Sequence, residues 1–73
     1  MEVIVYSKSG CPECVFTKKF LEEENILYKE KRVDQNKAYL DEVIELGFSS
    51  LPVVKIGDQI FSGYQPDKLQ TLV

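Results

Sequence analysis

The chain has 73 residues, a length that predicts one domain spanning residues 1–73. Its hydrophobic fraction of 44% and charged fraction of 29%, with few glycines and prolines, exclude a disordered or collagen-like chain. The net charge of −3 provides no long-range attraction to nucleic acid or to an anionic membrane, so neither is an expected partner.

The N-terminal residues carry no secretory pattern. Val3–Tyr6 is a short apolar run without a basic segment before it or a small-residue cleavage site after it. No segment approaches the roughly 20 apolar residues that cross a bilayer. We expect a cytoplasmic protein that acts as a monomer. In that compartment structural disulfides are uncommon, and paired cysteines indicate catalysis or metal binding.

The first half of the chain predicts a strand, a helix and a second strand. Val3–Tyr6 is β-branched and aromatic throughout, which is typical of a strand covered on both faces. A loop then leads to an amphipathic helix over 12–24, which begins at a proline and stops near Asn25. The weak alternation of Ile26–Val33 predicts the second strand, and Lys29–Arg32 is interpreted as its solvated edge. The apolar side of the helix, expected in the core, carries Phe16, Phe20 and Leu21.

A second helix follows, for which Asp34 or Asn36 is the expected N-cap. Gly47 suits its C-terminal cap, and Phe48 is expected to fold back onto the helix as a core residue. The spacing i, i+3, i+4, i+7 defines an apolar face made of Leu40, Val43, Ile44 and Gly47.

The C-terminal part predicts a hairpin and a short helix. Leu51–Ile56 is a strand entered through a proline, Gly57-Asp58 is a two-residue turn with glycine first, and Gln59–Ser62 is the returning strand, with Phe61 in the core. After Gly63 the last helix opens at a proline and carries Leu69 and Leu72. The order β-α-β-α-β-β-α predicts an α/β fold with a parallel, right-handed first half.

The only two cysteines, Cys11 and Cys14, lie at the start of the first helix. The free N–H groups of a first helical turn stabilise a thiolate, and Cys-X-X-Cys settings lower a cysteine pKa from about 8.5 to ~3.5–7.5. Lys8 adds a positive charge nearby, whereas Glu13 limits the shift. Cys14, almost one turn further on, faces the same side and is expected to be more buried and less acidic.

These positions suggest separate roles for the two thiols. Cys11 attacks a substrate disulfide and forms a mixed disulfide, which Cys14 then resolves. Pro12 stiffens the ring between them. Two other interpretations are a zinc site and cysteines that merely fill the core. A zinc site usually needs four Cys or His ligands, and this chain has no histidine. A C-x-x-C between the strand and helix of a βαβ unit favours redox chemistry.

The whole pattern resembles the thioredoxin-fold redoxins. The resemblance is carried by a strand followed by K-x-x-C-P-x-C, by Leu51-Pro52-Val53, and by a glycine turn near the C-terminus. It implies the thioredoxin fold, with a four-stranded mixed sheet flanked by three helices. It further implies a cis Pro52 packed against the active disulfide, and a Leu51 backbone that pairs with an incoming peptide or glutathione.

Two groups within that superfamily are similar to this chain. Glutaredoxins bind glutathione through a Gly-Gly followed by paired aspartates, which the stretch Phe61–Leu69 lacks. The segments "ELGFSSLPVV" and "SGYQPDKL" look instead like NrdH-redoxins, whose C-terminal signature is W-S-G-F-R-P-[DE]. Phe61, Tyr64 and Gln65 replace the usual Trp, Phe and Arg, and CPEC is nearer to a glutaredoxin CPYC than to CVQC.

The resemblance to NrdH-redoxins implies a dithiol–disulfide oxidoreductase that receives electrons from thioredoxin reductase and reduces ribonucleotide reductase. The Cys11–Cys14 disulfide is then the only redox group that the protein needs, and neither a separate cofactor nor a metal is expected. The expected partner-binding residues are Leu51, Val53, Ser62, Gly63, Tyr64 and Gln65.

Two alternative functions stay open. One is a glutathione-dependent dithiol glutaredoxin, which the anionic Glu13 slightly disfavours. The other is a metal or iron–sulfur carrier that bridges two chains through their Cys11 residues. The shortage of other ligands and the proline after Cys11 count against it.

Overall fold

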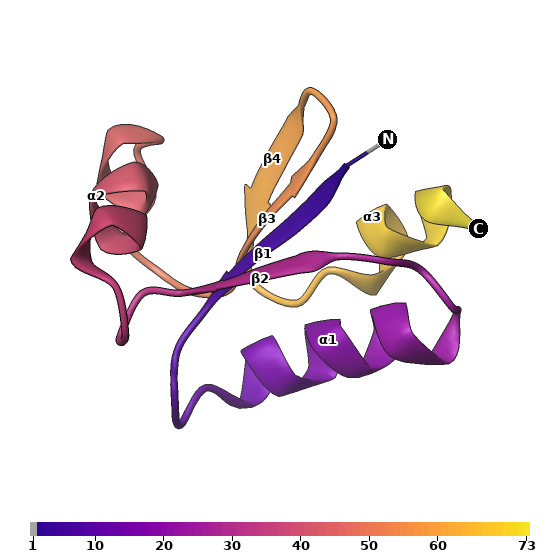
Figure 1. The fold of residues 1–73 in the computed structure, drawn as a ribbon. Helices are drawn as coiled ribbons and strands as arrows, with labels where there is room; N and C mark the ends of the chain where they lie inside the picture. Colours follow the sequence, from indigo (N-terminus) through magenta and orange to yellow (C-terminus); the bar gives the residue numbers. More distant parts are fainter. Residues whose placement is uncertain (1) are drawn as a thin grey trace.

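The computed structural model describes residues 2–73, and its elements follow the expected order (Figure 1). The last helix continues into a short 3₁₀ turn, η1. In this part of the chain no helix combines the length and the apolar character that a membrane crossing requires. The elements are β1 (Val3–Ser7), α1 (Pro12–Glu23), β2 (Lys29–Arg32), α2 (Lys37–Glu45), β3 (Val53–Ile56), β4 (Gln59–Ser62), α3 (Pro66–Leu69) and η1 (Gln70–Leu72).

The four strands form one mixed sheet in the order β2-β1-β3-β4. β1 and β2 are parallel, as expected for a βαβ unit, whereas β3 runs antiparallel to both β1 and β4. The register places Val5 opposite Val54, and Val54 opposite Phe61. At the hairpin Gly57 has a φ of 55°, which supports the predicted turn with glycine first. The predicted thioredoxin-type fold is confirmed.

Helices cover both faces of the sheet (Figure 1). α1 and α3 lie on one face, where Val5 and Leu21 belong to one buried cluster. α2 lies on the other face, where Tyr6 and Val43 belong to a second cluster. Successive residues of β1 alternate between the two clusters because side chains of a strand point to opposite faces. This explains the uninterrupted apolar run at Val3–Tyr6, which is buried throughout.

The ends of the two long helices are set by local chemistry. Asn36, one of the two expected caps, accepts a hydrogen bond from the Ala38 N–H at 3.0 Å and begins α2. Past its other end, Gly47 adopts a φ of 87°, and the Phe48 N–H bonds to the Val43 carbonyl at 3.2 Å. α1 is followed by Asn25 at a φ of 57°, which turns the chain toward β2.

Two predicted strands are too long. The second was expected over Ile26–Val33 and is confined to Lys29–Arg32, because the Ile26 N–H still bonds to Leu21 at the end of α1. The Lys29–Arg32 stretch, interpreted as a solvated edge, is also less exposed than predicted, since three of its four residues are partly buried. The third strand begins at Val53 rather than at Leu51. Pro52 has no N–H to donate to a ladder.

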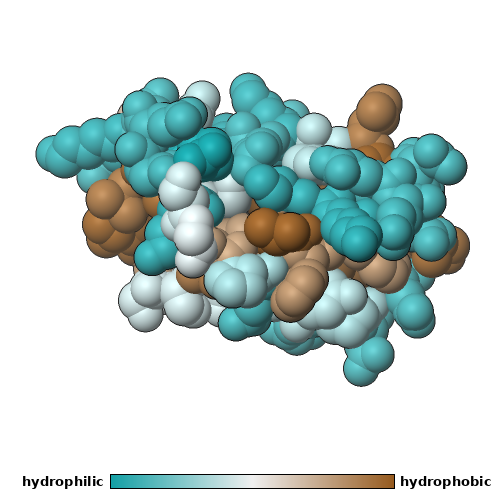
Figure 2. Space-filling view, turned by 90° about the horizontal axis from the view of Figure 1, so that it is seen from below, coloured by the Kyte–Doolittle hydropathy of each residue, from teal (hydrophilic) through white to brown (hydrophobic). Residues whose placement is uncertain are grey.

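Several apolar side chains predicted to be in the core are exposed. Phe16, at 52% exposure, lies on the outer side of α1, because the stripe that faces the sheet contains Cys14 and Leu21 instead. In α2 only Val43 is buried, while Leu40 and Ile44 are turned away by the rotation of about 100° per residue. Figure 2 shows hydrophobic atoms in the middle of a largely hydrophilic face and at the end occupied by α2.

Candidate active site

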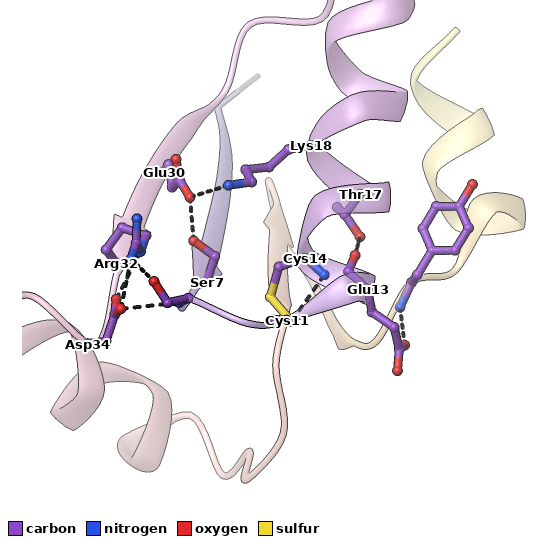
Figure 3. The surroundings of a disulfide bond; sticks show 11 residues. Ser7, Cys11, Glu13, Cys14, Thr17, Lys18, Glu30, Arg32 and Asp34 are labelled. Atoms are coloured by element: carbon purple, nitrogen blue, oxygen red, sulfur yellow. Dashed lines mark hydrogen bonds and ion pairs between the residues drawn. A yellow bond between two sulfur atoms is a disulfide. The ribbon is translucent and has the colours of Figure 1, made fainter.

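A disulfide joins Cys11 and Cys14 where the loop after β1 enters α1 (Figure 3). The two Cα atoms lie 5.2 Å apart, so the helix accommodates the bridge without unwinding. Cys11 is the N-cap, with an extended backbone, and Pro12 occupies the first helical position. The sequence therefore located both the bridge and the helix start correctly.

The Cys11 sulfur is held by the backbone of the first helical turn. Its Sγ accepts a hydrogen bond from the Cys14 N–H at 3.1 Å, in the place where an N-cap oxygen usually accepts. Cys11 is 8% exposed and Cys14 only 1%. The predicted difference in burial between the two cysteines is confirmed. In the reduced protein, the same amide would face a Cys11 thiolate.

The loop before β3 is joined to the segment after β4. The Leu51–Pro52 peptide bond is cis, as the resemblance implied. The Pro52 carbonyl accepts a hydrogen bond from the Gly63 N–H at 2.8 Å, which extends the β3–β4 pairing by one step. Val53 is fully buried in the α2-side cluster and has no surface to offer a partner, unlike the half-buried Leu51.

The turn over residues 62–65 is tied to the CPEC segment. The Glu13 Oε1 accepts a hydrogen bond from the Tyr64 N–H at 2.9 Å, and Figure 3 shows the Glu13 side chain extending away from Cys11. The Tyr64 ring lies 5.8 Å from the ring of Phe16, centroid to centroid. Gln65, where the resemblance would have an Arg, closes the turn by donating its Nε2 to the Ser62 carbonyl at 2.8 Å.

Lys8 and Leu51 line one groove, which has a volume of about 740 Å³. Both come from loops that border the disulfide segment, one before Cys11 and one before Pro52. The apolar part of the groove is provided by Val33, Leu40, Val43, Ile44 and Phe48. Lys8 is exposed, and its ammonium is available to solvent and to ligands at this edge of the site.

Three hydrogen-bonded polar side chains, which the sequence did not indicate, lie near the disulfide (Figure 3). The fully buried Ser7 donates its hydroxyl to Glu30, and Lys18, one turn after Cys14, forms an ion pair with the same carboxylate at 2.8 Å. Burial by itself raises the pKa of Glu30. The hydrogen bonds from Lys18 and Ser7 and the neighbouring positive charges outweigh it, so that pKa lies below its usual value.

The loop that leads to Cys11 is fastened by a second polar group. The Ser9 N–H donates to Asp34 at 3.1 Å, and the Ser9 hydroxyl accepts a hydrogen bond from Arg32 at 3.0 Å. Arg32 and Asp34 are themselves paired at 2.7 Å, which holds the pKa of Asp34 well below its usual range. Ionic side chains of β2 and the residues after it thus position the loop before the nucleophile.

No signal in the sequence pointed to these contacts. Ser7 and Glu30 are 23 residues apart, and Glu13 and Tyr64 are 51 apart, so local patterns do not report them. Only the parallel pairing of β1 with β2 brings the first pair together. Among residues 2–73 no group of three or more His, Cys, Asp or Glu side chains is arranged to hold a metal ion.

A thioredoxin-type sheet with a disulfide at the first turn of α1 defines the chain as a thiol–disulfide oxidoreductase. Comparison with known proteins makes the assignment more specific. A family model described as Glutaredoxin matches residues 3–61. The chain belongs to the glutaredoxin family, and its relatives are NrdH proteins of that family.

The similarity to those relatives runs from end to end. The chain is 40% identical over 70 residues to the glutaredoxin-like protein NrdH of Lactococcus lactis subsp. cremoris, covering 96% of this chain and 97% of that protein. It is 31% identical over 72 residues to NrdH of Escherichia coli K12, covering 99% and 89%.

Solved structures agree. The NrdH-redoxin of Escherichia coli superposes with a TM-score of 0.95 at 30% identity, covering 100% of this chain and 96% of that one. The thioredoxin-like protein BC3987 gives a TM-score of 0.91 at 33% identity, covering 99% and 100%. The chain is therefore an NrdH-like redox protein with a C-x-x-C disulfide.

Proposed function

We propose that this protein is an electron donor in the cytoplasm that reduces ribonucleotide reductase and is itself reduced by thioredoxin reductase. The observation that carries the proposal is the end-to-end likeness to NrdH proteins, at 40% identity over 96% of the chain. The Escherichia coli NrdH-redoxin, whose fold this chain shares, is described as having a thioredoxin-like activity profile. In this chain the segment after β4 lacks the double glycine and the paired aspartates that glutathione-binding glutaredoxins are expected to carry.

The proposed chemistry uses only the two cysteines. The Cys11 thiolate attacks one sulfur of a substrate disulfide, forms a mixed disulfide and releases one substrate thiolate. Cys14 then loses its proton and attacks Cys11, so that the Cys11–Cys14 bond forms and the second substrate thiolate leaves. The substrate gains two electrons, and the protein becomes the oxidised form seen in the structure.

The exposures of the two cysteine residues support this order of events. Cys11, at 8% exposure, is the residue that a partner reaches first, whereas Cys14, at 1%, is almost completely covered. The amide bonded to the Cys11 sulfur favours its thiolate. We propose that no cofactor beyond this disulfide is needed, that Lys8 adds favourable charge, and that Pro52 shields the pair.

A comparison of two reducing systems tests the proposed electron source. The oxidised protein is supplied either with NADPH and a bacterial thioredoxin reductase, or with glutathione, glutathione reductase and NADPH. We expect NADPH consumption to be at least about ten-fold faster in the first system at equal protein concentration. Rapid turnover with glutathione alone would show that the chain is a glutathione-dependent glutaredoxin. A metal-rich preparation bridged through Cys11 would favour the carrier.

Cysteine variants test the assigned roles. Cys11→Ser should abolish disulfide exchange, because no accessible nucleophile remains. Cys14→Ser should accumulate a mixed disulfide between Cys11 and ribonucleotide reductase, visible on non-reducing gels and reversed by dithiothreitol. If Cys11→Ser forms the adduct and Cys14→Ser does not, the two roles are reversed.

A further inference from the structure

The carboxylate between the two cysteines binds a remote backbone amide. Glu13 lies within the disulfide ring, and its Oε1 accepts the Tyr64 N–H at 2.9 Å across 51 residues of sequence. From the sequence alone, Glu13 is a negative charge near Cys11 and nothing more. In the structure the same carboxylate also accepts a hydrogen bond from a backbone N–H of the segment between β4 and α3.

The turn is shaped to admit this carboxylate. Gly63 has a φ of 83°, and a Cβ atom built there would lie 3.3 Å from the Glu13 Oε1, so glycine leaves the carboxylate room over the backbone. One helical turn after Glu13, Phe16 packs its ring against the ring of Tyr64. Two side chains of α1 therefore contact Tyr64. Glu13 binds its amide, and Phe16 packs against its ring.

An unfilled amide at this place would attract anions. It would lie within one glutamate side chain of the CPEC segment, and a backbone N–H forms a charge-assisted hydrogen bond with a carboxylate. A thiol substrate that carries a carboxylate would gain a charge-assisted hydrogen bond there while its sulfur approached Cys11. Glu13 occupies the amide and places a negative charge next to the approach path.

We propose that Glu13 is a specificity-determining residue that excludes carboxylate-bearing thiols, glutathione being the representative, from the Cys11–Cys14 disulfide. This inference rests on the proposed function, since it explains why a chain with a glutaredoxin fold would take electrons from a reductase rather than from glutathione. Its two components are occupancy of the Tyr64 amide and repulsion between like charges.

The excluded reaction is reduction of the disulfide by two glutathione molecules. The thiolate of the first forms a bond with the Cys11 sulfur while the Cys11–Cys14 bond breaks and Cys14 leaves as a thiolate. The thiolate of the second then bonds to the first glutathione sulfur and releases Cys11. Two glutathione thiolates supply the two electrons and end as one glutathione disulfide.

Two substitutions separate occupancy from charge. Glu13→Gln removes the charge but keeps an oxygen that can accept the Tyr64 N–H, whereas Glu13→Ala removes both. Glu23→Ala is the matched control, because Glu23 is an exposed glutamate at the other end of α1. Each oxidised protein is mixed separately with reduced glutathione and with neutral 2-mercaptoethanol. The chain has no tryptophan, so disulfide reduction is followed by acid quenching, alkylation and mass measurement.

The decisive quantity is the glutathione rate constant divided by the 2-mercaptoethanol rate constant. A change in the pKa of either cysteine affects both thiols alike and cancels in this ratio. We expect Glu13→Ala to raise the ratio about 5- to 50-fold, because a charge-assisted hydrogen bond becomes available to glutathione. Glu13→Gln should raise it by no more than about 5-fold, the size of an exposed charge effect. Glu23→Ala should leave it unchanged.

A ratio that stays within two-fold of the original in Glu13→Ala overturns the inference. Equal rises in both Glu13 variants that vanish at 0.5 M salt overturn the occupancy component, since screened charge would account for the whole effect. Fast reduction of the unmodified protein by glutathione is a different result, because it contradicts the proposed function itself. Slow reduction of the unmodified protein and of both variants contradicts only the role given to Glu13.

Discussion

The two faces of the sheet hold their helices in different ways. On the face of α1 and α3, Leu21 is fully buried within an apolar cluster of seven residues. On the opposite face α2 has Val43 as its one buried residue, and polar contacts do much of the fastening. There Glu42 accepts hydrogen bonds from the Tyr6 hydroxyl at 2.7 Å and from Lys31 at 2.9 Å. Burial, with the bond to Glu42, raises the pKa of Tyr6 to about 12.

This difference shows how a chain of 73 residues divides its apolar side chains. The helix that begins at the two cysteines lies on the tightly packed face, so the disulfide is attached to the more densely packed part of the molecule. The polar attachment of α2 leaves Leu40 and Ile44 partly exposed, along the groove that Leu51 also lines. One face therefore contributes stability, and the other presents an accessible apolar surface beside the site.

The largest effect is expected for a cavity in the tightly packed face. Leu21→Ala should lower the free energy of unfolding by about 2–5 kcal/mol, because Leu21 is fully buried and its neighbours cannot close the space. Urea unfolding of the oxidised protein, followed by circular dichroism, measures the change. A loss under 1 kcal/mol would contradict the idea that this face is the main source of stability.

A smaller effect is expected for the polar attachment of α2. Tyr6→Phe keeps the buried ring but removes the hydroxyl that donates to Glu42, which should cost about 1–2 kcal/mol of unfolding free energy. Tyr39→Phe is the control, because it also removes a tyrosine hydroxyl from this face. It keeps the Tyr39 ring, whose centroid lies 5.3 Å from the Lys31 ammonium. Equal stability of both variants in urea would indicate that the hydroxyl contributes nothing to holding α2.

Acid should weaken the protein through Glu30. Its folded-state pKa lies below the unfolded value, so its contribution is complete above the unfolded pKa of about 4.3 and is lost as pH falls through the folded value. We expect the contribution of this group to the unfolding free energy to be constant from pH 8 to 6 and to be lost progressively toward pH 3. Glu30→Gln should flatten that part of the profile, and an unchanged profile would contradict the assignment.

The smallest effect is expected on the open face. Ile44→Ala removes a side chain that is 61% exposed, and the unfolding free energy should change by less than about 0.5 kcal/mol. Its comparison with Leu21→Ala tests the contrast directly, since both substitutions shorten a branched apolar residue in a helix. If the two variants lost similar stability, α2 would be packed as tightly as α1.

The element order and the position of the disulfide could be predicted because both depend on short-range patterns. Strand composition, helix spacing and the C-x-x-C motif act over a few residues, and the cis Pro52 followed from the resemblance. The exposure of Phe16 and Ile44 could not be predicted in the same way. An apolar stripe shows that a helix has an apolar side, but the width of the buried strip depends on how closely the sheet approaches it.

The hydrogen bonds and ion pairs around the site could not be predicted from the sequence for a related reason. Glu13, Glu30 and Glu42 each accept hydrogen bonds from residues far along the chain, and the chain offers twelve acidic residues with nothing to distinguish these three. Tertiary placement alone selects them. The interpretation of Lys29–Arg32 as a solvated edge shows the same limit, because three of its residues form ion pairs.

The outer position of β2 also bears on how these molecules meet one another. An open strand edge can recruit the edge of a second molecule and start a growing aggregate. In β2 every residue is charged, with three cations and one anion within four positions. A short strand of charged side chains is one of the ways in which proteins blunt such an edge, because pairing with a second molecule would require these charges to lose water. The strand that anchors the loop before Cys11 therefore offers a poor template for a further strand.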